Sequence, residues 1–424
     1  MLNDIIYKLK TDRFWRNNLI FFIGSMVVAG LNYLFYPILG RLMNLEAFGE
    51  AQALISMFLQ TGILLSAFSL VVANVVTNKN DEFQKLTIIR ELEKLAFIIL
   101  IVGAILALCF VVPIQNFLNF DSPYPFVLLM VSVLISVPIA FRNAFLQGKL
   151  DFLGMSFGGI IVALGKIIFS VSLVVIGFST LGVMGGIICA QMVTLGYLIH
   201  RVSKRGWKFG LRKDNIHLPM LGSVRPELMY GGLVFIVNFI TILLFSSDIL
   251  VIKHYFSPEE AGLFAGVAAI GRISFFASMS VAGVLFPSIK LSQTSAQNKG
   301  LFIRSALITL AISLPIFIIF VLFPSQIINL MIGSRYLPEA GLLPRLAFAA
   351  LLISFVNLLF YYHLALRRIF TIYIALVGIV FTIILIANFH NTLVQVINDF
   401  IYGNILLLLI LIIWSTSGRL GKQI

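Results

Sequence analysis

Apolar runs of about 20 residues recur along the whole chain, and few charged residues interrupt them. A helix rises about 1.5 Å per residue, so each run can cross the hydrocarbon core of a bilayer, which is about 30 Å thick. The runs are continuously apolar rather than alternating, which argues against membrane strands. The hydrophobic fraction is 60%, whereas soluble domains contain about 45–50% apolar residues. The sequence therefore predicts an all-α integral membrane protein.

Twelve runs have the length and composition of a transmembrane helix, and the more polar residues 1–17 are interpreted as a short interfacial helix. Most of the 30 Lys and Arg residues then fall on one side of the membrane, and the other side has only Arg41, Lys253, Arg335 and Arg345. Because basic residues accumulate on the cytoplasmic side, we predict that both termini are cytoplasmic. The predicted spans are 18–40, 52–76, 95–114, 124–145, 153–177, 180–200, 228–252, 261–287, 302–323, 342–366, 369–388 and 394–414.

A basic segment near the middle of the chain, residues 201–227, separates two halves of similar pattern. We interpret it as a cytoplasmic linker between an N-terminal six-helix lobe, residues 1–200, and a C-terminal six-helix lobe, residues 228–424. An even number of spans in each half gives both halves the same orientation, so a pseudo-two-fold axis along the membrane normal is predicted to relate the lobes. The matches behind this duplication are Glu46-Ala-Phe-Gly49 with Glu259-Glu-Ala-Gly262, Pro113-Ile-Gln115 with Pro324-Ser-Gln326, and Leu146…Lys149…Phe152 with Leu364…Arg367…Phe370.

The sequence lacks the motifs of several function classes. It contains no Gly-x-x-x-x-Gly-Lys-Ser/Thr loop for ATP, no His-Glu-x-x-His and no Cys-His cluster for metal, and no Gly-x-Ser-x-Gly. We therefore predict that the protein is not an enzyme and uses no cofactor or metal. The formal net charge of +13 is explained by cytoplasmic loops and anionic lipid headgroups, so no nucleic-acid partner is expected.

Ionisable residues inside the apolar runs are the candidate functional residues, because a charge in a span costs free energy unless it is paired or hydrated. Lys166 and Arg272 lie deep in their spans, and we assign them to a water-filled cavity between the lobes; the alternative is a buried salt bridge. Arg41 and Asp248 lie nearer span ends, where snorkelling is the alternative. Asn238 shares a helical stripe with Asp248. Asp399, near the start of the last span, is interpreted as interfacial.

The sign of these charges indicates the kind of ligand. Three of the four candidate residues are cationic, and such a lining favours an anion, such as the phosphate or diphosphate headgroup of a lipid. An exporter of cations would be expected to carry more intramembrane carboxylates. Small-xxx-small pairs such as Gly182/Gly186 and Gly262/Gly266 are instead interpreted as close helix packing.

An ordered series of short motifs covers essentially the whole length. It comprises Leu39-Gly-Arg41, Glu46-Ala-Phe-Gly49, Phe145-Leu-Gln-Gly148 with Phe152, Lys166, Asp248, Glu260-Ala-Gly262-Leu-Phe-Ala265, Pro287 and Gly333-Ser-Arg-Tyr336. With this series the chain resembles the polysaccharide/oligosaccharide flippases (Wzx-like) of the multidrug/oligosaccharidyl-lipid/polysaccharide exporter superfamily. The resemblance implies a MATE-like fold of two six-helix lobes around a cavity that opens alternately to each membrane face.

The resemblance also implies a function. Such proteins turn a polyprenyl-diphosphate-linked oligosaccharide from the inner to the outer leaflet of the prokaryotic cytoplasmic membrane, for surface polysaccharide biosynthesis. The expected partners are this substrate, membrane lipids, and a glycan polymerase or glycosyltransferases. Lys166, Arg272 and Arg41 are the expected substrate-cavity residues, and Asp248 and Asn238 are assigned to ion coupling or lobe pairing. Two alternatives remain: a MATE-type cation-coupled exporter of small amphiphiles, and a non-transporting membrane scaffold for glycan assembly.

Overall fold

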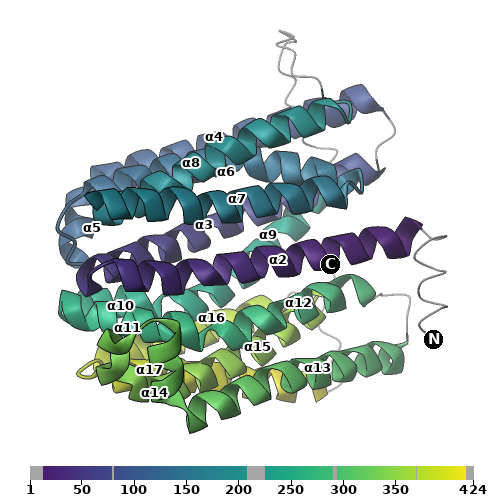
Figure 1. Cartoon of the computed structure of the whole chain (residues 1–424). Helices are drawn as coiled ribbons and strands as arrows, with labels where there is room; N and C mark the ends of the chain where they lie inside the picture. The colour runs from purple at the N-terminus through teal and green to yellow at the C-terminus, as the bar shows by residue number, and fades with distance from the viewer. Residues whose placement is uncertain (1–12, 79–80, 208–224, 290–293, 369, 417–424) are drawn as a thin grey trace. The chain divides into compact units, whose positions relative to one another are not determined.

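The computed structural model describes residues 13–78, 81–207, 225–289, 294–368 and 370–416, and within them the chain is helical throughout, with no β-strand (Figure 1). These residues include 10 helices that are long and apolar enough to cross a membrane, or 11 if one bent pair forms a single span. One of the ten, Phe152–Ser203, contains two helices separated by a kink. The all-helical membrane fold is confirmed, while the exact count of twelve spans stays a prediction.

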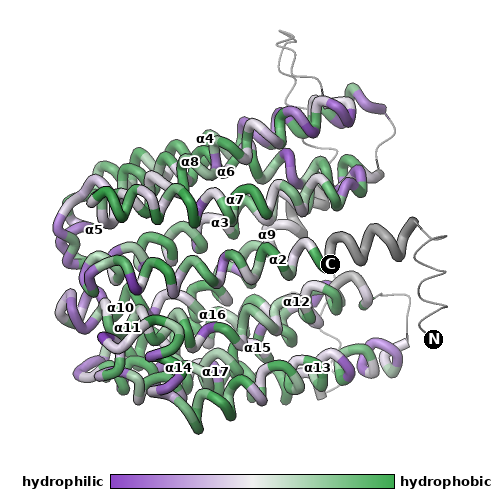
Figure 2. The backbone as a smooth tube through the Cα atoms, in the orientation of Figure 1, coloured by the Kyte–Doolittle hydropathy of each residue, from purple (hydrophilic) through white to green (hydrophobic). Residues whose placement is uncertain are grey.

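Hydrophobic residues occupy the middle of the helices, and hydrophilic residues collect at many of their ends (Figure 2). This is the distribution that a helix needs in a bilayer, because its polar ends can reach water and headgroups while its centre cannot. Residues 1–12 of the predicted interfacial helix lie outside the described part of the chain, and residues 13–17 belong to the first described helix.

Two compact units are present. The first comprises Met1–Leu42, Thr61–Asn116 and Phe120–Gly232, and the second Met43–Gln60, Phe117–Asn119 and Leu233–Ile424. The predicted lobes, 1–200 and 228–424, follow the order of the sequence, whereas these units assign residues 43–60 and 117–119 to the second body. Of the predicted linker 201–227, residues 208–224 lie outside the described residues.

Within the first unit, α7 packs against both α2 and α8, and α6 packs against α4 and α8. The hairpin between α7 and α8 turns at Gly177, whose φ of 107° favours glycine. Its arms approach closely at Gly186, where a Cβ atom would overlap the backbone of Ser170. The helices that lie wholly or partly in this unit are α2 (Arg13–Leu42), α3 (Leu45–Asn78), α4 (Glu82–Cys109), α5 (Val111–Phe117), α6 (Tyr124–Gly148), α7 (Phe152–Leu173), η1 (Val174–Phe178) and α8 (Ser179–Ser203).

The second unit contains α15 at its centre, in contact with α11, α12, α13 and α17. One of its spans is bent by 47° between α9 and α10. In another span, Pro258–Leu285, Arg272 lies between α11 and α12 without breaking the span. The helices are α9 (Arg225–Ser246), α10 (Asp248–Tyr255), α11 (Pro258–Gly271), α12 (Ile273–Ser288), α13 (Ser295–Leu322), α14 (Pro324–Met331), η3 (Ser334–Leu342), α15 (Leu343–Ala365), α16 (Phe370–Asn388) and α17 (Leu393–Thr416).

Candidate functional site

Lys166 projects from the middle of α7 toward α2, both in the first unit. Its Nζ donates a hydrogen bond to Oδ1 of Asn32 at 2.7 Å and lies 4.3 Å from the ring centroid of Phe35. The side chain is half-buried. Among the described residues, no carboxylate forms an ion pair with it. Lys166 is therefore a cation within a span whose charge has only neutral partners.

Small residues bring α2 and α7 close together on the N-terminal side of Lys166 and its contacts. A Cβ atom on Gly24 would overlap Ser156, and a Cβ atom on Gly159 would lie 2.9 Å from Cγ2 of Val28. These contacts advance along both helices in the same direction, so α2 and α7 run parallel. The close approach ends one to two turns before Lys166, where the larger side chains of Asn32 and Phe35 face the lysine.

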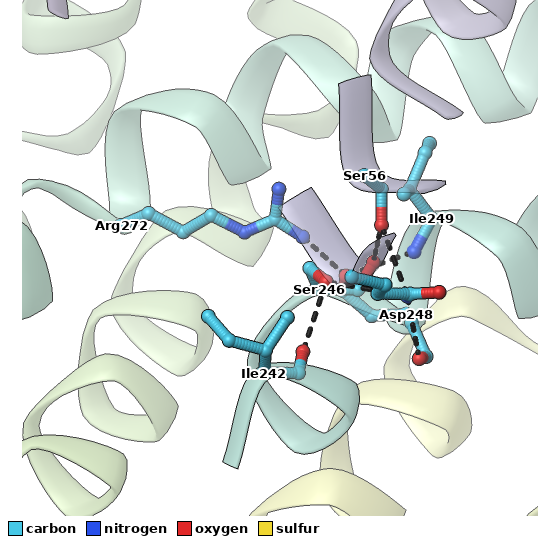
Figure 3. Close-up of polar contacts among 8 residues, drawn as sticks. Ser56, Ile242, Ser246, Asp248, Ile249 and Arg272 are labelled. Carbon is cyan, nitrogen blue, oxygen red and sulfur yellow. Dashed lines mark hydrogen bonds and ion pairs between the residues drawn. The ribbon is translucent and has the colours of Figure 1, made fainter. Parts of the chain in front are cut away.

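A second polar cluster lies in the second unit, where α10 follows α9 and α12 follows α11 (Figure 3). Arg272 donates through Nη2 to Oδ1 of Asp248, and both side chains are largely buried. The guanidinium lies 5.3 Å from the ring centroid of Phe245. Asp248 Oδ1 also accepts a hydrogen bond of 2.8 Å from the backbone N–H of Ile249. Arg272 and Asp248 thus form a buried ion pair, which was the alternative to a water-filled cavity for Arg272.

The break between α9 and α10 is held by the first half of α3, which belongs to the same unit. Ser56 Oγ donates to the carbonyl oxygen of Ser246 at 2.5 Å, and Gln60 Nε2 donates to Ser247 Oγ at 3.2 Å (Figure 3). A broken helix leaves backbone groups without intrahelical partners, and in a membrane these groups need partners from the protein. Ser56 supplies one, which fixes where Asp248 begins α10.

A small pocket of about 30 Å³ adjoins the ion pair and is large enough for one or two water molecules. Asn404 of α17 lines it together with Asp248 and Arg272, and the buried Oδ1 of Asn404 has no hydrogen-bond partner. Asp399, expected at the interface, is 3% exposed and its Oδ2 is also unpartnered. Asn404 therefore shares the pocket of the ion pair, whereas Asp399 does not line it.

The other two candidate residues lie apart from these contacts. Arg41 is exposed in the last turn of α2. Asn238 is half-buried on α9, on the other side of the helix break from Asp248. Of the predicted site residues, the structure joins Asp248 and Arg272 directly.

Sequence reasoning missed Asn32, Phe35, Asn404 and the burial of Asp399. The available signal was a polar amide within an apolar run, at Asn32 and again at Asn404. The free-energy cost of an amide side chain in a transmembrane helix is low enough that such residues are common there. Only the packing of α2 against α7 identifies Asn32 as the partner of Lys166.

A family model described as "Polysaccharide biosynthesis protein" matches residues 14–293, which is most of the chain. A comparison with curated proteins found no match. Solved structures do match. "Lipid II flippase MurJ, inward closed conformation" has a TM-score of 0.71 and 15% identity, covering 94% of this chain and 88% of that chain.

Two multidrug transporters are similarly close in fold. "Inward-facing conformation of a multidrug resistance MATE family transporter of the MOP superfamily" has a TM-score of 0.70 and 13% identity, covering 91% of this chain and 93% of the other. The MATE multidrug transporter DinF-BH, solved as a complex, has a TM-score of 0.70 and 15% identity, covering 95% of this chain and 94% of the other. At these identities the matches establish a common fold, the one expected from the sequence.

Proposed function

Because the chain belongs to the polysaccharide biosynthesis protein family, we propose that it moves a polyprenyl-diphosphate-linked oligosaccharide from the inner to the outer leaflet by alternating access. The observation that carries this proposal is Lys166, a cation within a span whose described contacts are all neutral. Keeping such a charge is costly, and an anionic ligand that passes through the membrane gives a reason to keep it. A lipid diphosphate has that charge.

Arg272 can supply a second cationic contact for the diphosphate. It uses Nη2 on Asp248, and a guanidinium has five N–H donors in a planar fork suited to phosphate oxygens. Arg41, exposed at the end of α2, is proposed to contact the substrate near the outer mouth. These three residues form the proposed substrate set.

Asp248 is proposed to couple transport to an ion. A phosphate on Arg272 competes with Asp248 for the same guanidinium, and a carboxylate that loses its partner within a span favours a proton or another cation. Asn238, on α9 before the bend, is proposed as a second oxygen donor for such a cation. Substrate binding and ion binding then become linked through the single ion pair of Asp248 and Arg272.

The proposed location is the prokaryotic cytoplasmic membrane, with both termini in the cytoplasm. The distribution of Lys and Arg residues among the loops supports this orientation. Inner-leaflet substrate is the product of glycosyltransferases, and outer-leaflet product is the substrate of a polymerase. Both kinds of enzyme are therefore the proposed protein partners.

The proposal is tested with the full chain in proteoliposomes that contain a fluorescent polyprenyl-diphosphate-linked oligosaccharide, and a membrane-impermeant quencher reports its movement between leaflets. We expect movement by the wild type, with a rate about tenfold or more lower in Lys166→Met, because a charge-assisted phosphate contact contributes roughly 1.5–3 kcal/mol. Lys94→Met is the matched control, since Lys94 is exposed and pairs only with Glu91 one turn earlier. Wild-type rates in Lys166→Met would contradict the site.

A second candidate function is cation-coupled export of small amphiphiles, which the fold shared with multidrug transporters favours. The same liposomes, loaded with a cationic fluorescent dye, distinguish the two. The flippase proposal expects no dye movement above that of empty liposomes. Dye export without lipid movement would establish the exporter, and movement of neither would favour a scaffold for glycan assembly.

A further inference from the structure

The ammonium of Lys166 is held by an amide and an aromatic ring, and this choice of partners has chemical consequences. A lysine ammonium has three N–H donors. One donates to Asn32 Oδ1 at 2.7 Å, and the group faces the Phe35 ring at 4.3 Å. Neither partner carries a negative charge, so neither neutralises the ammonium, and at least one of its N–H donors can serve another acceptor.

Asn32 is itself fixed in the orientation that this contact requires. Its Nδ2 donates to the backbone carbonyl of Val28 at 3.0 Å, one turn earlier on α2. That bond identifies the nitrogen end of the amide and directs Oδ1 toward Lys166. The carboxamide therefore orients the lysine as a carboxylate would, but without neutralising it.

Phe35 supplies the second restraint. Its side chain is fully buried, and its ring packs edge-on against Tyr36 with centroids 6.0 Å apart. A ring face attracts a cation through its quadrupole and offers no lone pair. Phe35 thus keeps the flexible lysine side chain from extending toward the membrane surface, as lysines in spans otherwise do.

We propose that Asn32 and Phe35 are positioning residues that hold the Lys166 ammonium, uncompensated, for an oxygen of a lipid diphosphate. This inference rests on the proposed function and assigns the residues that make Lys166 competent for it. A carboxylate at position 32 would form an ion pair with Lys166 and neutralise its charge. An aliphatic side chain at position 35 would remove the ring face and leave the ammonium free to move away.

The test measures binding of farnesyl diphosphate to the full chain in detergent by isothermal titration calorimetry, with farnesol as the uncharged probe. We expect Asn32→Asp to weaken farnesyl diphosphate binding about tenfold, because an ion pair replaces a neutral contact. Asn391→Asp, at an exposed loop residue, adds the same charge and is expected to bind as the wild type does. Farnesol binding is expected to be unchanged in all variants.

Two further comparisons separate positioning from folding. Phe35→Tyr keeps the ring face and is expected to bind within about twofold of wild type, whereas Phe35→Leu is expected to lose about threefold to tenfold. In a Lys166→Met background, Asn32→Asp is expected to have no additional effect, since the two residues act as a unit. If Asn32→Asp does not fold, the comparison of Phe35→Tyr with Phe35→Leu tests the inference instead.

The outcomes distinguish the inference from the function on which it rests. If Lys166→Met abolishes binding while Asn32→Asp and Phe35→Leu bind as the wild type, the positioning role is wrong and the substrate site survives. If Lys166→Met itself binds normally, both are wrong. An equal loss of farnesol binding would also overturn the inference, because the effect would not depend on charge.

Discussion

At the scale of single residues, charged groups in this protein have two distinct kinds of partner. Lys166 has an amide and a ring, while Arg272 has a carboxylate. The sequence identified both cations from their depth in apolar runs, but it could not assign their partners. Asn32 and Lys166 are far apart in the chain, and only the packing of α2 on α7 joins them.

A contrasting carboxylate, Asp151, lies between the spans at the start of α7. It accepts hydrogen bonds from Arg201 at 2.9 Å, from Arg205 at 2.8 Å and from the backbone N–H of Gly154 at 3.1 Å. Burial raises the pKa of Asp151, but the two arginines and the Gly154 N–H outweigh burial, so its pKa is lowered overall. The cluster ties the loop before α7 to the end of α8.

Asp151→Asn is expected to reduce stability by about 1–2 kcal/mol at pH 7, with partial exposure of the arginines limiting the loss. Because the folded-state pKa of Asp151 is lowered, its contribution is complete above the unfolded value of about 3.9 and is lost as the pH falls below it. Thermal unfolding of both proteins in detergent between pH 7 and pH 3 measures this. A melting-temperature difference that does not shrink toward pH 3 would contradict the assignment.

At the scale of elements, each unit contains a tryptophan that packs against an aromatic ring and an arginine. In the first unit, Trp207 packs on Phe145 with ring centroids 5.1 Å apart and on Arg142 at 5.2 Å. In the second, Trp414 packs on His363 at 4.5 Å and on Arg368 at 5.3 Å. Phe145 and His363 directly precede Leu146 and Leu364, which the internal match aligned. The arginines lie on opposite sides of the aligned residues in sequence, so the duplication stays a prediction.

The bend between α9 and α10 was not predicted from the sequence. Ser246, Ser247 and Asp248 interrupt the apolar run 228–252 and are compatible with a kink, but they do not give its angle of 47°. The bend depends on Ser56 and Gln60 of α3, whose hydrogen bonds are tertiary. The glycine pairs, by contrast, were interpreted correctly, since Gly186 does lie against the neighbouring helix.

Two glycines of α8 provide a matched test of this packing. A Cβ atom at Gly186 would overlap Ser170, whereas Gly196 has open space. Gly186→Ala is expected to cost about 1–3 kcal/mol by overpacking. Gly196→Ala is expected to be neutral or to add up to about 1 kcal/mol through helix propensity. Thermal unfolding in detergent compares them, and equal melting temperatures would show that α7 and α8 do not approach as described.

At the scale of the whole molecule, composition and run length were sufficient for the fold class, and the order of short motifs was sufficient for the family. The family match places the chain in the polysaccharide biosynthesis protein family, and the fold matches confirm the expected fold. The boundaries of the compact units could not be predicted from the sequence, because residues 43–60 join the second unit through tertiary contacts such as that of Phe48 with Tyr336. The kind of substrate likewise could not be predicted from the sequence alone, because it depends on the directions in which a few lysine and arginine side chains point.

The most direct test of the account is a cryo-electron microscopy structure of the full chain with a polyprenyl-diphosphate-linked oligosaccharide bound. We predict phosphate density within hydrogen-bond distance, about 2.7–3.2 Å, of Lys166 Nζ, with Asn32 and Phe35 still in contact with that lysine. Density for the diphosphate elsewhere, with Lys166 touching only Asn32 and Phe35, would contradict it.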